Sequence, residues 1–454
     1  MPEALNAISQ AHSIDVKSRM AAMLCISLGV FVASLDTAIT NTALPTISKQ
    51  LKCSPADVIW VVSSYQLLMV GAMLPLVAFG EKCGHRKVFG VGLILFTVTS
   101  LLCGVAGSLR LLIAARALQG FGAAAIIGAN AALVKQIYPP EKLGKGLGLN
   151  ALVVASGLAS GPVVASGILA ISTWHWLFYL NIPVGVVAMV LVWKLPPQKL
   201  LSSQSFDVFS ATLCFAVFSF FIHALGALVH IASAVQVGVE LLMVLLCGLV
   251  LVRREIHKPF PILPVDLFQN RLFSLTTATA VAAFTVQGLA LVALPFFFHS
   301  VLNRAPVEVG LLIAPWPFMG AMMAPVAGSL SDRISAAALG GLGLLILGGA
   351  LATLTLLRSD INSVWIALCM MFCGLGFGLF LSPNQKILMS SAPKSRGGSA
   401  SGILGTSRLL GQAIGAVLVA LALSQSQMDG SVHVLWLGVV IALVGASVSL
   451  SRLC

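Results

Sequence analysis

The sequence predicts an all-α integral membrane protein with fourteen membrane-spanning helices. Hydrophobic residues make up 58% of the 454-residue chain and charged residues only 9%, whereas soluble domains contain about 25% charged residues. Mean hydropathy is +1.02. Apolar stretches of about 17 to 25 residues recur along the chain, each long enough to cross a hydrocarbon core of about 30 Å as a helix. No soluble domain fits between them.

The polar breaks between the apolar stretches define the spans. The seventh and eighth spans are separated only by HIASA, and a single re-entrant unit in their place would keep both termini on one side. The predicted spans are 20–43, 57–79, 88–108, 110–134, 146–171, 176–194, 207–229, 235–252, 270–296, 307–330, 335–357, 361–383, 398–424 and 433–451.

The net charge of +12 indicates membrane orientation rather than a nucleic-acid partner. Most of the 26 Lys and Arg residues fall on the side that holds both termini, as the positive-inside rule requires of cytoplasmic loops. We therefore expect a multi-pass protein of the cell inner membrane, with both termini cytoplasmic and the lipid bilayer as its environment. The predicted outer loops hold only Lys49, Lys52, Arg110, Arg304 and Arg358.

The termini and cysteines indicate neither processing nor a cofactor. The first 19 residues are polar, and the first span is longer than the core of a signal peptide, which predicts a retained helix behind a cytoplasmic tail. The nine cysteines have neither metal-ligand nor disulfide-framework spacing. There is no G-x-x-x-x-G-K-[ST] loop for a nucleotide. We expect no cofactor and no metal site, so any transport must use a gradient.

Two segments repeat a pattern about 250 residues apart, LVAFGEKCGHRK at 76–87 and AGSLSDRIS at 327–335. Each combines small residues, an acid and a base before a turn into the next helix. Similar sequence segments in the two halves of a chain are typical of transporters built from repeats. Gly and Pro are also frequent within the spans at 157–167, 314–325 and 374–383, where they favour close helix approach and bending. Ordinary bundle packing is the alternative for any one glycine.

Six motifs in order make the chain similar to a known family. They are LDTAITNTALPTI at 35–47, GEKCGHRK at 80–87, RALQGFGAA at 116–124, GLASGPVVASG at 157–167, WHWLFYLNIPVG at 174–185 and GSLSDR at 328–333. Over essentially its full length, the chain resembles the fourteen-span drug:proton antiporters of the major facilitator superfamily. The departures are Val77, Glu81 and His85 in the loop motif, and Ala165 and Ser166 in the antiporter motif.

The resemblance implies a major facilitator fold, with two six-helix bundles and two extra helices inserted between them. It also implies a division of the chain into a cytoplasmic tail at 1–19, an N-terminal bundle at 20–199, an inserted pair at 207–252, a cytoplasmic linker at 253–269 and a C-terminal bundle at 270–454.

Asp36 is the first candidate for function, because a carboxylate in hydrocarbon costs about 2.5 to 3.5 kcal/mol unless it is paired, neutralised or hydrated. Helical spacing places Thr37, Thr40 and Asn41 beside it in one polar stripe, which should face a partner helix or the central cavity. Desolvation favours the protonated form of such an acid and hydration the ionised form, so Asp36 is a candidate for proton coupling and cation recognition. A structural carboxylate bonded to a neighbouring helix is the alternative.

Other ionisable residues also lie within spans. The resemblance implies a proton-coupling role for Arg116, which could instead extend its charge to the membrane interface, and Gln119 should share its helix face. Arg408 could bind an anionic group, pair with Asp36 across the cavity, or serve a structural role. Glu240 and His223 belong to the inserted pair, and we expect them to lie outside the transport core.

Aromatic and amide side chains of the core spans suit a loose amphipathic pocket. Together with the charged and polar groups above, the candidate substrate-binding residues are Asp36, Thr40, Asn41, Tyr65, Gln66, Gln119, Asn150, Gln287, Trp316, Phe318, Asn384 and Arg408. Gln385 and Thr37 are their neighbours.

Charges and glycines of the repeated loops could form a gate that pairs across helix ends, or simply be solvated. The candidate gating residues are Glu81, Lys82, Gly84, Arg86, Gly161, Pro162, Asp332 and Arg333.

The function expected is secondary active transport, with export of amphipathic, cationic drugs or toxic compounds in exchange for protons by alternating access. The protein is not expected to be an enzyme. We expect a monomer, with periplasmic and outer-membrane proteins considered as partners. Three alternatives remain: a dedicated exporter of one metabolite, peptide or siderophore, a proton-coupled importer, and a membrane receptor or scaffold that transports nothing.

Overall fold

The computed structural model describes residues 16–139, 143–197, 206–227, 234–256, 258, 261–357, 361–393, 397–426 and 429–453. Most of the predicted N-terminal tail and the connection between the seventh and eighth spans lie outside these residues. The described part of the chain contains fourteen helical segments long and apolar enough to cross a membrane, which confirms the predicted number of spans.

Most spans are single helices, and four consist of shorter helical pieces joined end to end. The single-helix spans are α2 (Val16–Gln50), α5 (His85–Gly104), α6 (Leu109–Ile137), α7 (Leu143–Ile171), α10 (Val208–Ala227), α11 (Ala234–Glu255), α15 (Ala336–Thr355), α16 (Ser363–Ser391), α17 (Gly397–Gln425) and α18 (Asp429–Leu450). The composite spans are α3 (Pro55–Val58) with α4 (Trp60–Cys83), α8 (His175–Tyr179) with α9 (Asn181–Leu191) and η2 (Val192–Lys194), α12 (Arg271–Phe296) with η4 (Phe297–Val301), and α13 (Pro306–Ile313) with α14 (Pro315–Leu330). The short 3-10 helices η3 (Val265–Gln269) and η6 (Ser451–Leu453) flank the C-terminal half.

Two helices continue well past their predicted ends. The first was predicted to end at 43 but continues through Pro45 to Gln50, and the twelfth was predicted to end at 383 but continues through Pro383 to Ser391. Proline removes one backbone donor from a helix, yet the flanking turns remain helical here. The polar residues after each proline therefore extend the helix beyond the apolar stretch that the prediction used.

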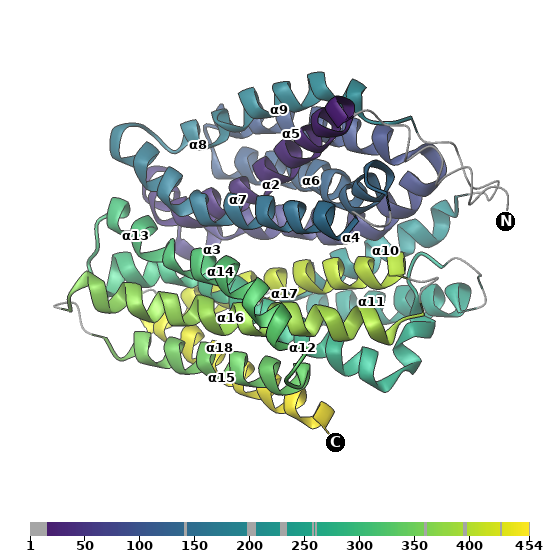
Figure 1. Cartoon of the computed structure of the whole chain (residues 1–454). Coiled ribbons are helices and arrows are strands. Elements are labelled where there is room, and N and C mark those ends of the chain that lie inside the picture. Colours follow the sequence, from purple (N-terminus) through teal and green to yellow (C-terminus); the bar gives the residue numbers. More distant parts are fainter. Residues whose placement is uncertain are drawn as a thin grey trace, which may run out of the picture.

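The spans form two bundles, one from each half of the chain (Figure 1). In the N-terminal half, α2 packs on α7 and α9, while α6 packs on α4 and α5. In the C-terminal half, α12 packs on α17 and α18, and α16 packs on α14 and α15. The described ends of the first and last spans lie at the same end of the molecule, which we call the terminal end.

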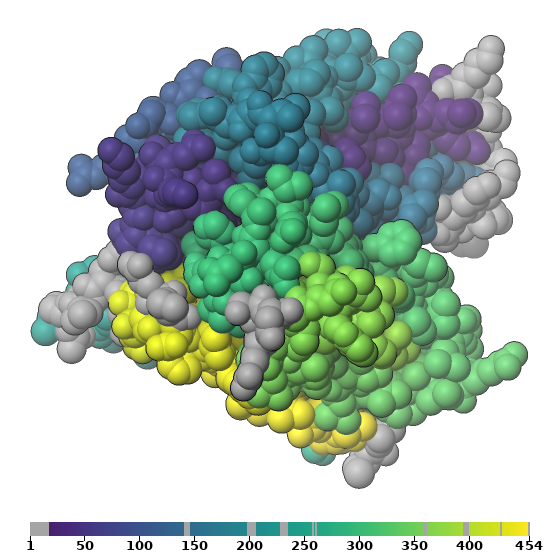
Figure 2. Space-filling model, turned by 90° about the vertical axis from the view of Figure 1, so that its left-hand side faces the viewer, coloured from purple at the N-terminus to yellow at the C-terminus, as the bar shows by residue number. Residues whose placement is uncertain are grey.

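The two halves meet along a seam formed by α2, α4 and α7 on one side and α12, α13, α14 and α17 on the other. At the end away from the termini, which faces the viewer in Figure 2, atoms of the two halves are in direct contact. Gly310 on α13 is close enough to α7 that an added Cβ would lie 1.9 Å from the Ser166 hydroxyl and 2.2 Å from the Pro162 carbonyl oxygen. Only glycine fits this crossing.

The inserted pair, α10 and α11, packs together and lies outside the two bundles. Helix α10 contacts both α4 and α17, so it touches both halves. Phe215 on α10 covers Gly71 on α4, whose added Cβ would lie 2.9 Å from the phenylalanine ring. Helix α11 carries a long row of exposed leucines and valines, as expected of a lipid-facing helix.

Candidate functional site

Asp36 lies inside the N-terminal bundle, where it forms a buried ion pair with Arg116. The Arg116 Nη1 atom lies 2.5 Å from Asp36 Oδ2, and the two side chains are 1% and 0% exposed. The pair joins α2 to α6 through two residues that are 80 positions apart in the sequence. The helix positions of both residues were predicted from their polarity; their direct contact was not.

Neighbouring amides complete the coordination of the Asp36 carboxylate. Asn181 Nδ2 donates to Asp36 Oδ1 at 2.7 Å, and Gln119 Nε2 donates to the same oxygen at 3.2 Å. Gln119 also accepts from Arg116 Nη1 at 2.7 Å and donates to Ser100 Oγ at 2.8 Å. Arg116, Gln119 and Asn181 together thus supply three hydrogen-bond donors to this one carboxylate.

The Arg116 guanidinium is enclosed by backbone and aromatic groups. Its Nε donates to the Val61 carbonyl oxygen at 3.2 Å. The ring of Tyr65 lies 4.2 Å from the guanidinium carbon, and that of Phe178 lies 5.7 Å away, both within range of a cation–π interaction. Charge neutralisation and hydrogen bonding thus allow both ions to remain in the apolar interior.

Sequence reasoning missed Asn181 and Ser100 as members of this cluster. Asn181 lies within the quoted stretch WHWLFYLNIPVG, and a lone amide in an otherwise apolar span was the available signal. Ser100 offered no such signal, because serine is common in membrane helices, where its hydroxyl bonds to the preceding turn. Here that bond runs to the Phe96 carbonyl oxygen at 2.7 Å.

The other polar residues of the stripe on α2 have different surroundings from those of the ion pair. Asn41 lines a small cavity of about 30 Å³ on the seam, together with Pro162, Gln287 and Trp316. Thr40 is buried, and its hydroxyl has no hydrogen-bond partner. The Oδ1 atom of Asn41 and the indole nitrogen of Trp316 also lack partners. Buried polar atoms without partners are costly, so these groups are suited to bind water or a ligand.

A larger cavity of about 360 Å³ lies on the seam nearer the end away from the termini. Thr42 lines both cavities, so α2 connects them along the seam. Lys49 is the charged residue that lines the larger cavity, and none of the described residues that line either cavity is an acid. The remaining lining residues are Pro45, Thr46, Gln50, His299, Pro306 and Val309.

Arg408 is not paired with Asp36. Within the described part of the chain it has neither a hydrogen bond nor an ion pair, although it lies within electrostatic range of Tyr65. One turn further along α17, Gln412 donates to the cavity residue Gln287 at 3.1 Å. Among the described residues this leaves an unpaired, partly buried guanidinium on α17, a helix that packs on α12 and also contacts α4 of the other half.

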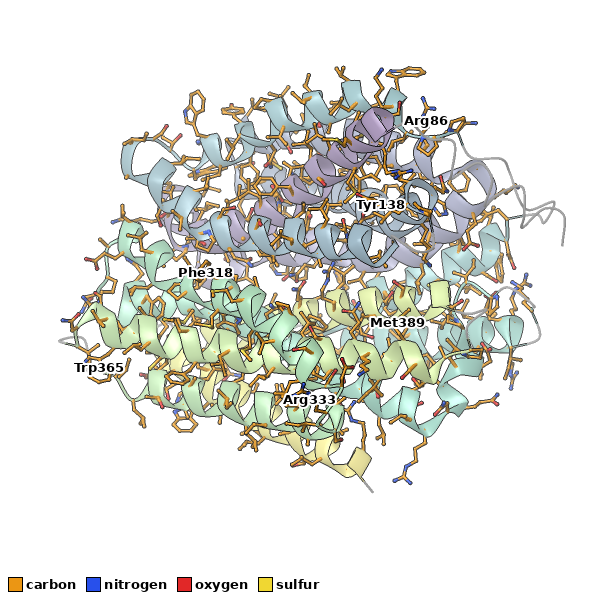
Figure 3. The ribbon with its side chains drawn as sticks, in the orientation of Figure 1. Arg86, Tyr138, Phe318, Arg333, Trp365 and Met389 are labelled. Carbon is orange, nitrogen blue, oxygen red and sulfur yellow. The ribbon has the colours of Figure 1, made fainter. Side chains whose placement is uncertain are left out.

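Several other candidates lie away from the two cavities. Asn384 packs within the C-terminal half, where its side chain accepts from Arg452 Nη1 at 2.9 Å and donates to the Thr276 carbonyl oxygen at 3.3 Å. Phe318, labelled in Figure 3, is 57% exposed and lines neither cavity. Gln66 is buried on α4 and Asn150 partly buried on α7, each with an amide oxygen that lacks a partner.

The candidate gating charges do not pair with one another in this conformation. Figure 3 shows Arg86 on the N-terminal half and Arg333 on the C-terminal half. Arg86 lies against the ring of Trp193, and Asp332 pairs with Lys386 at 2.5 Å. Among the described residues, no ion pair joins the two repeated segments. Glu81, Lys82 and Arg333 are exposed at the terminal end.

The glycines of these motifs have clear backbone roles. Gly84 adopts a φ of 97° between α4 and α5, a conformation that favours glycine. Gly161, beside Pro162, allows α7 to approach α2, because an added Cβ would lie 2.3 Å from the Ala38 Cβ.

The two residues flagged on the inserted pair contact each other. The Nδ1 atom of His223 on α10 lies 3.0 Å from Oε1 of Glu240 on α11, and Gln236 donates to the same oxygen at 3.2 Å. They therefore join the two inserted helices, and they line neither cavity.

Comparison with known proteins agrees with this arrangement. The Major Facilitator Superfamily profile matches residues 26–416. The chain is 43% identical to the uncharacterized transporter YebQ of Escherichia coli, over 97% of both chains. It is 29% identical to the riboflavin transporter RibZ of Clostridioides difficile, over 90% of both. It is 31% identical to the multidrug resistance protein Stp of Mycobacterium tuberculosis, over 88% of this chain and 75% of Stp.

A solved structure shares the fold at low sequence identity. It is a bacterial homologue of the human lysosomal transporter Spinster, in an inward-facing and unoccupied conformation, with a TM-score of 0.71 and 15% identity over 96% of this chain and 97% of that one. Two packed helical bundles with cavities along their seam define a multi-pass membrane transporter, not an enzyme. The chain belongs to the major facilitator superfamily.

Proposed function

We propose that this protein is a proton-coupled exporter of amphipathic small molecules, which uses the Asp36–Arg116 pair as its proton-linked element. The observation that carries this proposal is the burial of a single carboxylate whose charge is balanced by a single guanidinium. Protonation of Asp36 would remove that balance. Arg116 would then keep only its contacts to Gln119 and Val61.

Helix α2 offers a route from proton binding to movement of the two halves. It carries Asp36 on the face that packs toward α6 and α9, and Asn41 and Thr42 on the cavity side. It also contacts α12 of the other half. A change in its packing inside the N-terminal bundle therefore changes the seam, which is the movement that alternating access requires.

The direction of transport and the membrane are part of the proposal. The excess of Lys and Arg at the terminal end supports cytoplasmic termini, so export would run from that end to the other across the cytoplasmic membrane. The similarity to Stp, described as a multidrug resistance protein, supports broad export.

The test is pH-driven dye movement in everted membrane vesicles, with one cationic dye, ethidium, and one anionic dye, fluorescein. We expect Asp36→Asn to abolish the part of the flux that depends on an imposed pH gradient, because an amide cannot exchange a proton. Undiminished pH-driven movement of both dyes by Asp36→Asn would refute the coupling role. Asp429→Asn makes the same chemical change at an exposed position of α18 and should retain wild-type flux.

A dedicated exporter of one compound is the second candidate. The unpaired Arg408 favours it, because a single fixed charge selects one class of ligand. The similarity to a protein described as a riboflavin transporter also supports this candidate, because that description names one substrate. Competition between unrelated dyes for the same flux would exclude this candidate.

A further inference from the structure

We infer that the transported molecule carries an anionic group and that Arg408 binds this group in the seam between the two halves. The inference rests on the proposed function, since it concerns the substrate of that transport pathway. It differs from the cationic substrate that the sequence favoured, and the contacts of Asp36 are the reason.

The acid on which cation binding was predicted to depend is already engaged. Asp36 is fully buried and accepts from Arg116, Gln119 and Asn181. A cationic substrate would have to displace Arg116 from a contact that the protein supplies within one bundle. The carboxylate is therefore unavailable to a cation in this conformation.

Arg408, by contrast, has no partner. Its side chain is partly buried, and within the described residues it makes no hydrogen bond or ion pair. A charged side chain at membrane depth is costly unless it is paired or hydrated. Since the fold supplies no acid for Arg408, a ligand or water must satisfy it.

Helix geometry places Arg408 toward the seam. On α17, Gly405 faces Met73 of α4, while Gly411 and Gly415 face α12. At 100° per residue, position 408 falls between these two directions. Arg408 therefore lies in the corner between α4 of one half and α12 of the other, and α12 in turn contacts α2.

An unpartnered polar atom lies near this corner. The ring of Tyr65 packs against Arg116, and its side chain is within electrostatic range of Arg408. The Tyr65 hydroxyl is buried and has no hydrogen-bond partner among the described residues. It is therefore a donor that could bind the same ligand as Arg408.

The charge along the seam is positive. Among the described residues Arg408 is unpaired, and although it lines neither cavity, Lys49 lines the larger one and no acid lines either. A guanidinium binds carboxylate or phosphate oxygens in a bidentate manner, whereas Met73 of α4, which lies against Gly405 about one turn before Arg408, offers an apolar contact. The ligand class that fits is a small organic anion with a carboxylate or phosphate group and an apolar body.

The test is equilibrium dialysis of the purified full-length protein, without a pH gradient, with two probes of equal shape and opposite charge, 2-naphthoate and 2-naphthylmethylammonium. We expect wild type to bind the anion more tightly than the cation. Arg408→Gln should weaken anion binding about 10- to 100-fold, which is the usual effect of losing a charge-assisted hydrogen bond. Arg408→Lys should retain part of the affinity, because it keeps the charge but not the bidentate geometry.

The matched control is Arg110→Gln, which removes the same charge from an exposed position at the start of α6 and should leave both affinities unchanged. Equal anion affinity in Arg408→Gln, a preference of wild type for the cation, or absence of saturable anion binding by wild type would each overturn the inference. The outcome is separable from that of the proposed function, because Asp36→Asn is judged by pH-driven flux and Arg408→Gln by binding at equilibrium.

Discussion

At the scale of single residues, the Asp36–Arg116 pair contributes little net stability to the fold, but removal of one partner destabilises the fold strongly. Removing two charges from water is expensive, and their attraction only repays that cost, so a buried ion pair is weak evidence of stability. Loss of one partner, however, leaves the other charge buried alone. Such a pair is well placed to respond to a proton, because protonation of Asp36 has the same electrostatic effect as removal of its charge.

This asymmetry predicts a non-additive pair of substitutions. Arg116→Gln should lower the free energy of unfolding by about 3 to 5 kcal/mol, since it leaves the Asp36 carboxylate uncompensated. The double variant Arg116→Gln with Asp36→Asn should recover much of that loss, because neutral amides can hydrogen-bond to each other and to Asn181. The measurement is denaturant unfolding in detergent, analysed as a double-mutant cycle.

The same double variant separates stability from transport. It should fold nearly as well as wild type yet remain inactive in pH-driven flux, because it has no exchangeable proton. Strictly additive losses of stability in the two single variants would contradict the direct coupling of Asp36 and Arg116.

At the scale of helices, a charged cluster at the terminal end joins the inserted pair. Asp207 precedes α10 and accepts from the Ser210 backbone N–H at 3.0 Å, from the Ser210 hydroxyl at 2.8 Å and from Arg254 at 3.1 Å. Lys258, just beyond α11, also donates to Asp207. Partial burial opposes ionisation of the Asp207 carboxyl, but the hydrogen bonds from Lys258, Ser210 and Arg254 outweigh it and lower the pKa.

A carboxyl whose pKa is lower in the folded state stabilises that state above its unfolded pKa, about 3.9 for Asp. We therefore expect Asp207→Asn to lower the free energy of unfolding by about 1 kcal/mol at pH 7. The effect is small because the side chain is 25% exposed and screened by solvent. The deficit relative to wild type should shrink as the pH falls below about 3.9, where the carboxyl of the unfolded chain takes up a proton, and should vanish once the pH passes below the lowered pKa of the folded state. Thermal unfolding of both proteins over this pH range is the measurement; a deficit independent of pH would argue against the ionic contribution.

At the scale of the whole molecule, the relation between the two halves depends on contacts at the end away from the termini. Gly310 permits α13 to lie against α7, and the nearest atom that is not part of a side chain is the Pro162 carbonyl oxygen, 2.2 Å from the position of an added Cβ. A backbone atom cannot move aside as a flexible side chain does. We therefore predict that this contact acts as a steric switch for closure of that end.

Gly310→Ala should therefore favour conformations in which the halves separate at that end. To detect this opening, a single cysteine would replace Thr46, which lines the larger cavity, in a variant without the native cysteines. Opening should increase the rate at which a water-soluble maleimide modifies this cysteine. We expect an increase of several-fold, which corresponds to a shift of about 1 kcal/mol in a two-state equilibrium. The control is Gly167→Ala on α7, the helix that Gly310 packs against, because no atom lies within 4 Å of the Cβ added there. An equal rate in Gly310→Ala and wild type would contradict the switch.

Much of the fold could be predicted because the bilayer imposes a simple rule. Each backbone polar group must be satisfied within its own helix, so each long apolar stretch becomes a spanning helix. Errors occurred at Pro45 and Pro383, where the chain remains helical beyond the apolar stretch. Helix ends depend on local capping and packing, which a hydropathy window does not register.

The candidate site was only partly predictable. Asp36, Arg116 and Arg408 stood out because each is costly in hydrocarbon. Pairing with Asp36 was considered for Arg408, whereas Arg116 was expected to have a proton-coupling role; the structure pairs Asp36 with Arg116. Asn384 was expected in the binding pocket but contacts Arg452 and Thr276 inside the C-terminal half, because the partner of an amide depends on neighbouring helices.

The sequence by itself determined that this is a membrane protein, how many helices it has, and which few positions carry charge at membrane depth, because these follow from the transfer free energies of residues considered in order along the chain. Only the tertiary structure decided which charges neutralise each other and which remain free. That outcome depends on the distances between helices remote in sequence, such as the 2.5 Å contact between α2 and α6. The same pairing that encloses Asp36 leaves Arg408 without a partner among the described residues, and this is why we infer an anionic rather than a cationic substrate.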